Sequence, residues 1–165
     1  MRRSRSAIDG VGLASGALLG TAVMTAVMEA AQARGMTRMS LPYLLGTMVG
    51  RRRATVRLSG IALHFVNGAL FASGYALVFT RSRRADWRVG AALGLLHGAV
   101  VLVAALPVLQ EIHPRMADED EGPDPTPMLQ PPGFIALNYG ARTPAVTLTA
   151  HAVYGAIVGA MYRVR

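Results

Sequence analysis

The stretch VGAALGLLHGAVVLVAALPVLQ, residues 89–110, decides the fold of this 165-residue chain. It contains 22 residues without a charged side chain. At about 1.5 Å per residue, a helix of this length reaches about 33 Å. The hydrocarbon core of a bilayer is about 30 Å thick, so the stretch predicts a transmembrane helix.

Three further stretches have the same character. Uncharged runs of 19, 23 and 20 residues lie between Asp9 and Glu29, between Arg57 and Arg81, and between Arg142 and Arg163. A soluble helical protein would interrupt such runs with charges to make a polar face. We therefore predict an all-α fold in which residues 1–165 form a single integral membrane domain. The expected four-transmembrane-helix bundle has helices over about 8–33, 58–80, 88–111 and 143–162.

The charged residues gather at the ends of these predicted helices. All 17 basic residues are arginine, and the net charge is +8. Cations at helix ends meet lipid phosphate, so the charge indicates the bilayer as a partner and not a nucleic acid. The basic loop at 81–88 and the acidic loop at 112–142 favour an orientation with both termini cytoplasmic, although Arg51–Arg53 argue for the opposite orientation. The absence of cysteine excludes disulfides and thiolate ligands.

The first half of the chain matches the second half in order. Three sets recur at the same spacing: Gly12, Gly16 and Gly20 as Gly90, Gly94 and Gly98; Pro42 and Gly50 as Pro132 and Gly140; His64, Gly68 and Tyr75 as His151, Gly155 and Tyr162. The matches predict two tandem helical hairpins, over about 8–80 and 88–162, related by a pseudo-two-fold axis along the membrane normal. The glycine rows, with Gly159, let helix backbones approach closely, and tight packing alone would explain them.

The loop inside each hairpin is longer than a hairpin requires. Leu41–Val49 and Gly133–Tyr139 are apolar but too short to cross a bilayer. They predict short interfacial or re-entrant segments in the first and third loops, on the same membrane face. The third loop also contains an acidic, proline-rich linker over 116–131, which we expect to be flexible.

Polar residues in the membrane helices predict one candidate site. Glu29, His64, Glu111 and His151 fall at similar depth, in one third of the bilayer. Carboxylates and neutral imidazoles suit a divalent cation or a proton relay, so these four are the candidate metal ligands. Supporting hydrogen bonds are expected from Asn67, Asn138 and Tyr154.

The same residues also have plainer interpretations. His64 and His151 could serve as structural hydrogen-bond links between helices, and Glu29 and Glu111 could be solvated carboxylates at the interface. His97 has no counterpart in the first hairpin, so we expect it to stand apart from a symmetric site. Because His113 precedes Pro114, it is expected to be a helix-end residue.

Four short motifs carry a family resemblance. The segments EIHPRM (111–116) and PPGFIALNYG (131–140), with LPYLLGT (41–47) and HFVNG (64–68), resemble an uncharacterised family of bacterial four-helix integral membrane proteins. The resemblance covers about residues 8–162. It implies the architecture and no activity, cofactor or partner.

Two classes of function remain open. The first is a small multi-pass membrane protein that binds a divalent cation, or relays protons or a solute, through the Glu/His site; haem held by two histidines ranks below a divalent metal. The second is a non-catalytic accessory or assembly subunit that packs against a membrane-protein partner or a second copy of itself. The chain has no nucleophile elbow, phosphate-binding loop or His-Glu-x-x-His pattern, so we do not expect an enzyme.

Overall fold

The computed structural model describes residues 8–116 and 129–164, and these are helical with short connections. Within them, four helical spans are long and apolar enough to cross a membrane: Gly10–Ala33, Arg53–Ser82, Trp87–Ile112 and Thr143–Met161. The all-α class is thus confirmed, and the chain is a multi-pass membrane protein. Most of the predicted acidic linker, residues 117–128, lies outside the described residues.

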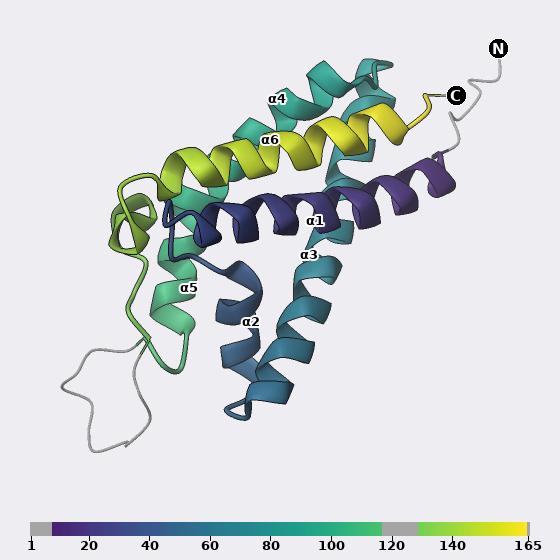
Figure 1. Cartoon of the computed structure of the whole chain (residues 1–165). Helices are drawn as coiled ribbons and strands as arrows, with labels where there is room; N and C mark the ends of the chain where they lie inside the picture. The colour runs from purple at the N-terminus through teal and green to yellow at the C-terminus, as the bar shows by residue number, and fades with distance from the viewer. Residues whose placement is uncertain (1–7, 117–128, 165) are drawn as a thin grey trace, which may run out of the picture.

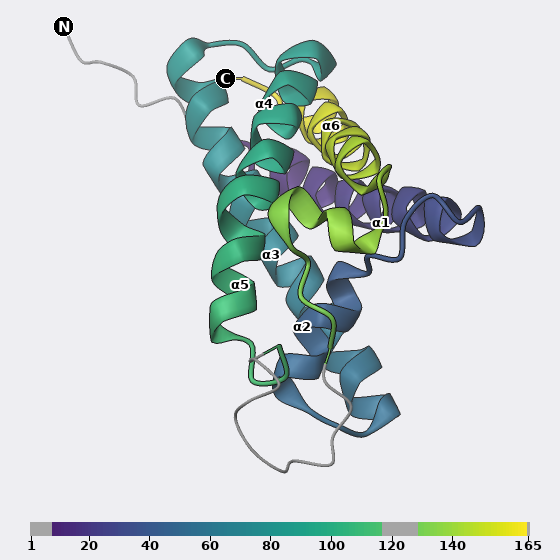
Figure 2. The same ribbon diagram turned by 90° about the vertical axis from the view of Figure 1, so that its left-hand side faces the viewer.

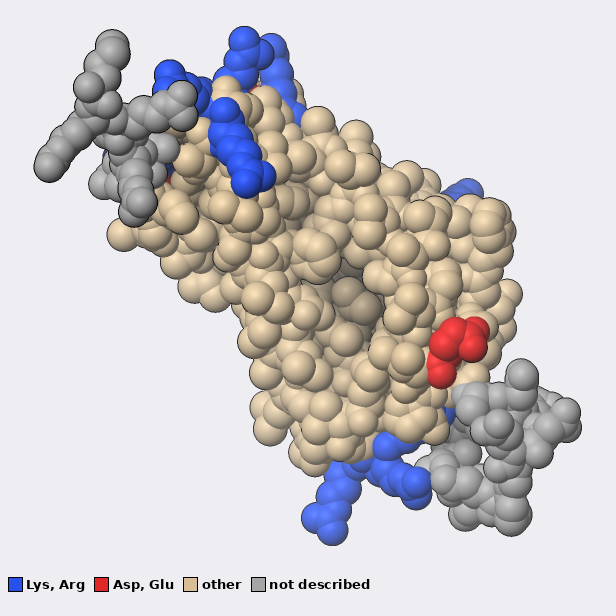
Figure 3. Space-filling model, turned by 180° about the vertical axis from the view of Figure 1, so that it is seen from behind, with Lys and Arg blue, Asp and Glu red and all other residues tan. Residues whose placement is uncertain are grey.

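The surface has the charge distribution of a membrane protein. Arginines gather towards opposite ends of the molecule, with a broad surface of uncharged residues between them (Figure 3). Large apolar side chains of the membrane-spanning helices are exposed, for example Leu18, Leu70 and Val103, which are 58%, 65% and 63% exposed. Such a belt matches the hydrocarbon between two headgroup layers.

The first and last long helices lie side by side. Helix α1 (Gly10–Ala33) begins after Asp9, whose carboxylate accepts a hydrogen bond from the N–H of Gly12 at 3.2 Å. The same carboxylate accepts from the N–H of Arg163, which follows α6 (Thr143–Met161), at 2.9 Å. The start of α1 and the end of α6 therefore meet at one end of the molecule (Figure 1).

Helix α3 (Arg53–Ser82) crosses α1 and α6 steeply (Figure 1) and begins five residues before the predicted bound at 58. The prediction placed the start of this helix after Arg57 because it counted uncharged residues only. An arginine near a helix end extends its charged head towards the headgroups while its stem lies along apolar surface, so the helix can continue through it. The other three spans begin and end within two residues of their predicted bounds.

The third span contains a change of helical type. It runs without interruption through α4 (Trp87–Val100), the π-helical segment η1 (Val101–Ala105) and α5 (Leu106–Ile112) (Figure 2), and it bends between α4 and α5 (Figure 1). Pro107 has no N–H, and its ring would press on the carbonyl of Val103 in a regular α-helix. The wider turn of η1 directly before it relieves this conflict.

Helix α6 is the shared partner of both glycine rows. Gly16 and Gly20 of α1 face Val158 and Tyr154, whereas Gly90 and Gly94 of α4 face the backbone of Gly155 and His151. A Cβ added at Gly94 would collide with the carbonyl oxygen of His151. The rows therefore permit close backbone packing, but the two predicted hairpins pack differently. In the first, Gly68 of α3 receives the side chain of Thr21.

The two short apolar segments have different conformations. Leu41–Val49 forms α2, which packs against α3 where Gly46 meets the backbone of Val56 and Gly60 meets that of Pro42. Phe134–Tyr139 forms η2, a 3₁₀ segment in which Ile135 and Ala136 have left-handed φ angles of 42° and 62°. These segments occupy corresponding places in the predicted repeat without sharing a structure, so the repeat stays a prediction.

His113 joins the end of α5 to α2. The side chain is only 2% exposed, and its Nδ1 accepts from the N–H of Arg115 at 3.1 Å. The ring hydrogen therefore lies on Nε2, which donates to the carbonyl of Leu44 at 3.1 Å and lies 3.2 Å from Oγ1 of Thr47. His113 is a helix-end residue, as predicted.

We expect acid to weaken this junction. Burial lowers the pKa of His113 below its ordinary value of 6.5, because desolvation disfavours the charged ring. As the pH falls below about 6.5, the unfolded chain takes up the proton first, so stability is lost until the pH passes the lower pKa of the folded protein. When the pH is lowered from about 7.5 to about 5, the unfolding midpoint of the wild type should decrease, and that of His113→Gln should decrease less. Equal falls in the two proteins would show that His113 does not carry the pH dependence.

Candidate functional site

A cavity of about 680 Å³ lies between α1, α2 and α3. Residues of the third span and of α6 complete its wall, notably Val101 and His151. Three of the four predicted ligands, Glu29, His64 and His151, line it. The cavity is therefore the place where most of the predicted site residues meet.

One face of α3 forms a cavity wall whose chemical character changes along the helix. Arg53, Arg57, Ile61, His64 and Phe65 line the cavity at spacings that put them on one side of the helix. From Arg53 to His64 the helix rises about 16 Å. The wall thus changes from cationic at the start of α3, through apolar, to an imidazole at the inner end.

The opposite wall, on α1, carries a polar row. Thr25, Glu29 and Gln32 line the cavity at helical spacing. Thr25 donates its hydroxyl hydrogen to the carbonyl of Thr21 at 2.8 Å, and Gln32 donates to the carbonyl of Met39 at 2.6 Å. Glu29 is exposed and offers a carboxylate to the cavity.

Two buried histidines occupy the inner end. His64 and His151 are each 5% exposed. The Nδ1 of His64 is buried without a hydrogen-bond partner among the described residues. His151 donates from Nδ1 to the carbonyl of Thr147 at 2.8 Å, so in the neutral ring Nε2 is left as an acceptor.

His97 does not line the cavity, but it contacts His151, which does. Its ring lies edge-on to that of His151, with 4.7 Å between centroids, and it stacks on Phe71 at 3.8 Å. Its Nδ1 is 3.3 Å from the hydroxyl of Tyr75. The cause is the close approach of α4 to α6 at Gly94 and Gly98, which brings the residue between them against His151. The glycines on either side of His97 indicate this close approach in the sequence, but the prediction considered only the depth of each residue in the bilayer.

Glu111 does not join the other predicted ligands. It is exposed on α5, beyond the π-helical segment, and does not line the cavity. Over residues 8–116 and 129–164, no three histidine, aspartate or glutamate side chains lie close enough together to hold a metal ion. The expected convergence of four ligands is therefore not found in the described part of the chain.

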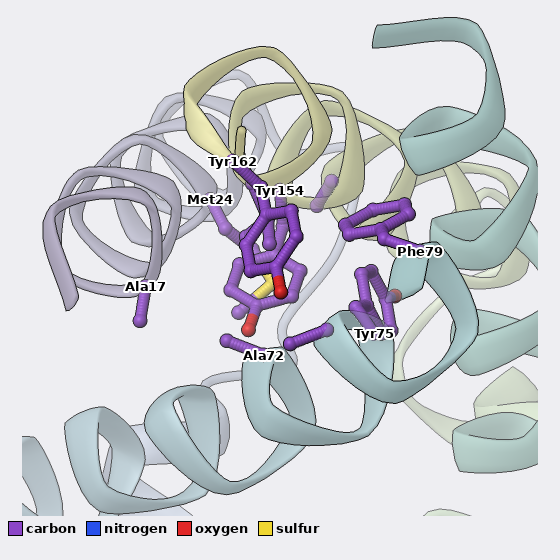
Figure 4. Close-up of a cluster of buried hydrophobic side chains, with 10 residues drawn as sticks. Ala17, Met24, Ala72, Tyr75, Phe79, Tyr154 and Tyr162 are labelled. Atoms are coloured by element: carbon purple, nitrogen blue, oxygen red, sulfur yellow. The ribbon is translucent and has the colours of Figure 1, made fainter. Parts of the chain in front are cut away.

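The supporting residues also separate. Tyr154 is fully buried where α1, α3 and α6 meet, and donates to the carbonyl of Gly68 at 2.5 Å (Figure 4). Asn138 is exposed, and its side chain donates to the carbonyl of Pro131. Asn67 is half-buried on α3 and is not part of the cavity wall. These three residues do not support the cavity with hydrogen bonds in this structure.

The chain matches no family model, no curated protein and no solved structure. Its resemblance to the bacterial four-helix membrane proteins therefore stays a prediction. Function has to be inferred from the geometry of the cavity.

Proposed function

We propose that this protein is a non-enzymatic membrane protein that binds a small solute in the cavity between α1, α2 and α3. His64 carries the proposal, because its ring lines the cavity and its Nδ1 has no hydrogen-bond partner among the described residues. Leaving a buried polar atom unpaired costs about 1–3 kcal/mol. A polar atom of a bound solute would remove that cost.

The arrangement of polar groups favours a solute over a metal ion. A metal site in a protein needs three or more ligand atoms around one point. In this cavity Glu29, His64 and His151 belong to three different helices and form no such group. They are suited to hydrogen bonds with separate atoms of one molecule, within a mostly apolar enclosure typical of organic ligands.

We further propose a bacterial cytoplasmic membrane location with both termini cytoplasmic. The basic loop at 81–88 supports this orientation. The contact between Asp9 and Arg163 supports a common side for the two ends.

A single engineered cysteine tests whether the cavity admits water and solutes. The natural chain has none, so each thiol is unambiguous. Thr25 lines the cavity, whereas Ser73 is exposed on the outer side of α3; each donates its hydroxyl to the carbonyl four residues earlier. In proteoliposomes, Thr25→Cys should react with a small methanethiosulfonate reagent at least about tenfold faster than Ser73→Cys, because a thiolate forms in water but not in hydrocarbon.

The labelling rates are measured by mass spectrometry of the intact protein. Equal and slow rates at the two positions would contradict a solvent-accessible cavity, and with it the proposed function. Unfolding midpoints equal to that of the wild type serve as the control that both variants are folded.

A further inference from the structure

We infer that the solute is an organic anion, with an acidic group on an apolar chain. The inference rests on the proposed function, since it requires that the cavity holds a solute. It follows from the charge at one end of the cavity, the apolar walls behind it and the volume.

The described lining has an excess of cations at the start of α3. Arg53 and Arg57 lie one turn apart on the cavity face of that helix, and Arg115, after α5, lines the cavity too. Arg51 is also part of the lining, and Glu29 is the carboxylate among these residues. A guanidinium presents a planar fork of donors that matches the two oxygens of a carboxylate or phosphate.

The walls behind these arginines are apolar. Six side chains form this part of the lining: Met24, Met28, Val56, Ile61, Phe65 and Val101. Arginines at the other end of the molecule, at 81–84, do not line the cavity and need only lipid phosphate as a partner. An arginine end joined to an apolar enclosure fits an acidic head with an apolar body.

The size of the cavity fits one small organic molecule. A volume of about 680 Å³ lies within the range of about 300–1,000 Å³ that is typical of small-molecule sites. From Arg57 to His64 the helix rises about 10 Å, which sets the spacing between the arginine end of the cavity and the His64 imidazole. A hydrocarbon chain with an acidic group at one end and a hydroxyl at the other could bind the arginines and the His64 imidazole at the same time.

Two probes of equal length test the acidic group. In the Thr25→Cys protein, ω-hydroxydecanoate should slow thiol labelling, and decanediol, which lacks the acid, should need at least about tenfold higher concentration for the same protection. Arg57→Gln should raise the concentration of ω-hydroxydecanoate required by about tenfold and leave that of decanediol unchanged.

Arg88→Gln is the matched control. Arg88 is exposed at the start of α4, stacks on Trp87 with 5.2 Å to the ring centroid, and does not line the cavity. This variant should alter protection by neither probe. If Arg57→Gln proves unstable, Arg53→Gln is the second variant and has the same expected result.

The outcomes separate the two proposals. If Thr25→Cys does not react in the absence of any probe, the proposed function fails. If it reacts but the acid and the diol protect equally, or protection by the acid is insensitive to both Arg57→Gln and Arg53→Gln, the organic anion is overturned while the solute cavity stands.

Discussion

Tyr154→Ala is expected to lower the free energy of unfolding by about 3–5 kcal/mol, the range for removing a buried aromatic ring. The ring is fully buried and fills the space where three helices meet: Gly20 of α1 faces it, and Ala72 and Tyr75 of α3 lie beside it (Figure 4). Because the glycine leaves no side chain to move inward, the cavity left by alanine cannot close easily.

Tyr154→Phe separates the ring from its hydroxyl. This variant keeps the packing and loses the hydrogen bond to the carbonyl of Gly68, which should cost about 0.5–1.5 kcal/mol. Both values can be measured by titrating the protein in mixed micelles with a denaturing detergent and following helicity. Similar costs for the two variants would mean that the ring does not carry the contact between these helices.

Gly94→Ala is the second large effect that we predict, a loss of about 1–3 kcal/mol. An added Cβ would meet the carbonyl oxygen of His151 and the Cα of Ala152, which are backbone atoms and cannot rotate away. Helices α4 and α6 must then move apart, and the contact between His97 and His151 would be lost with them.

Gly74→Ala is the control for this substitution. Gly74 lies in α3 with nothing within 4 Å of an added Cβ. Alanine is a better helix former than glycine by about 1 kcal/mol, so this variant should be as stable as the wild type or more stable. If the unfolding midpoints of the two variants agree, the close approach of α4 to α6 is refuted.

The long helices were predictable from the sequence because charge is expensive in hydrocarbon. Each uncharged run had to be a span, and the observed bounds differ mainly at Arg53, where charged residues belong to the helix end. The sequence also predicted that Glu29, His64 and His151 lie close to one another, because they fall at similar depth; all three line the cavity.

The remaining features depend on packing that depth and periodicity do not encode. The contact of His97 with His151 depends on how closely α4 approaches α6. Glu111 is exposed on α5 and does not line the cavity, although its predicted depth matches that of the other three residues. The left-handed backbone at Ile135 has no local sequence signal, since β-branched residues rarely adopt it.

The π-helical turn at Val101–Ala105 determines the rotation of α5 and His113 about the helix axis. One residue fewer there would turn the rest of the span by about 100°, the angular step of an α-helix. That rotation would move the His113 imidazole away from Leu44 and Thr47. The number of residues in the π-helical turn therefore determines whether the end of α5 can contact α2.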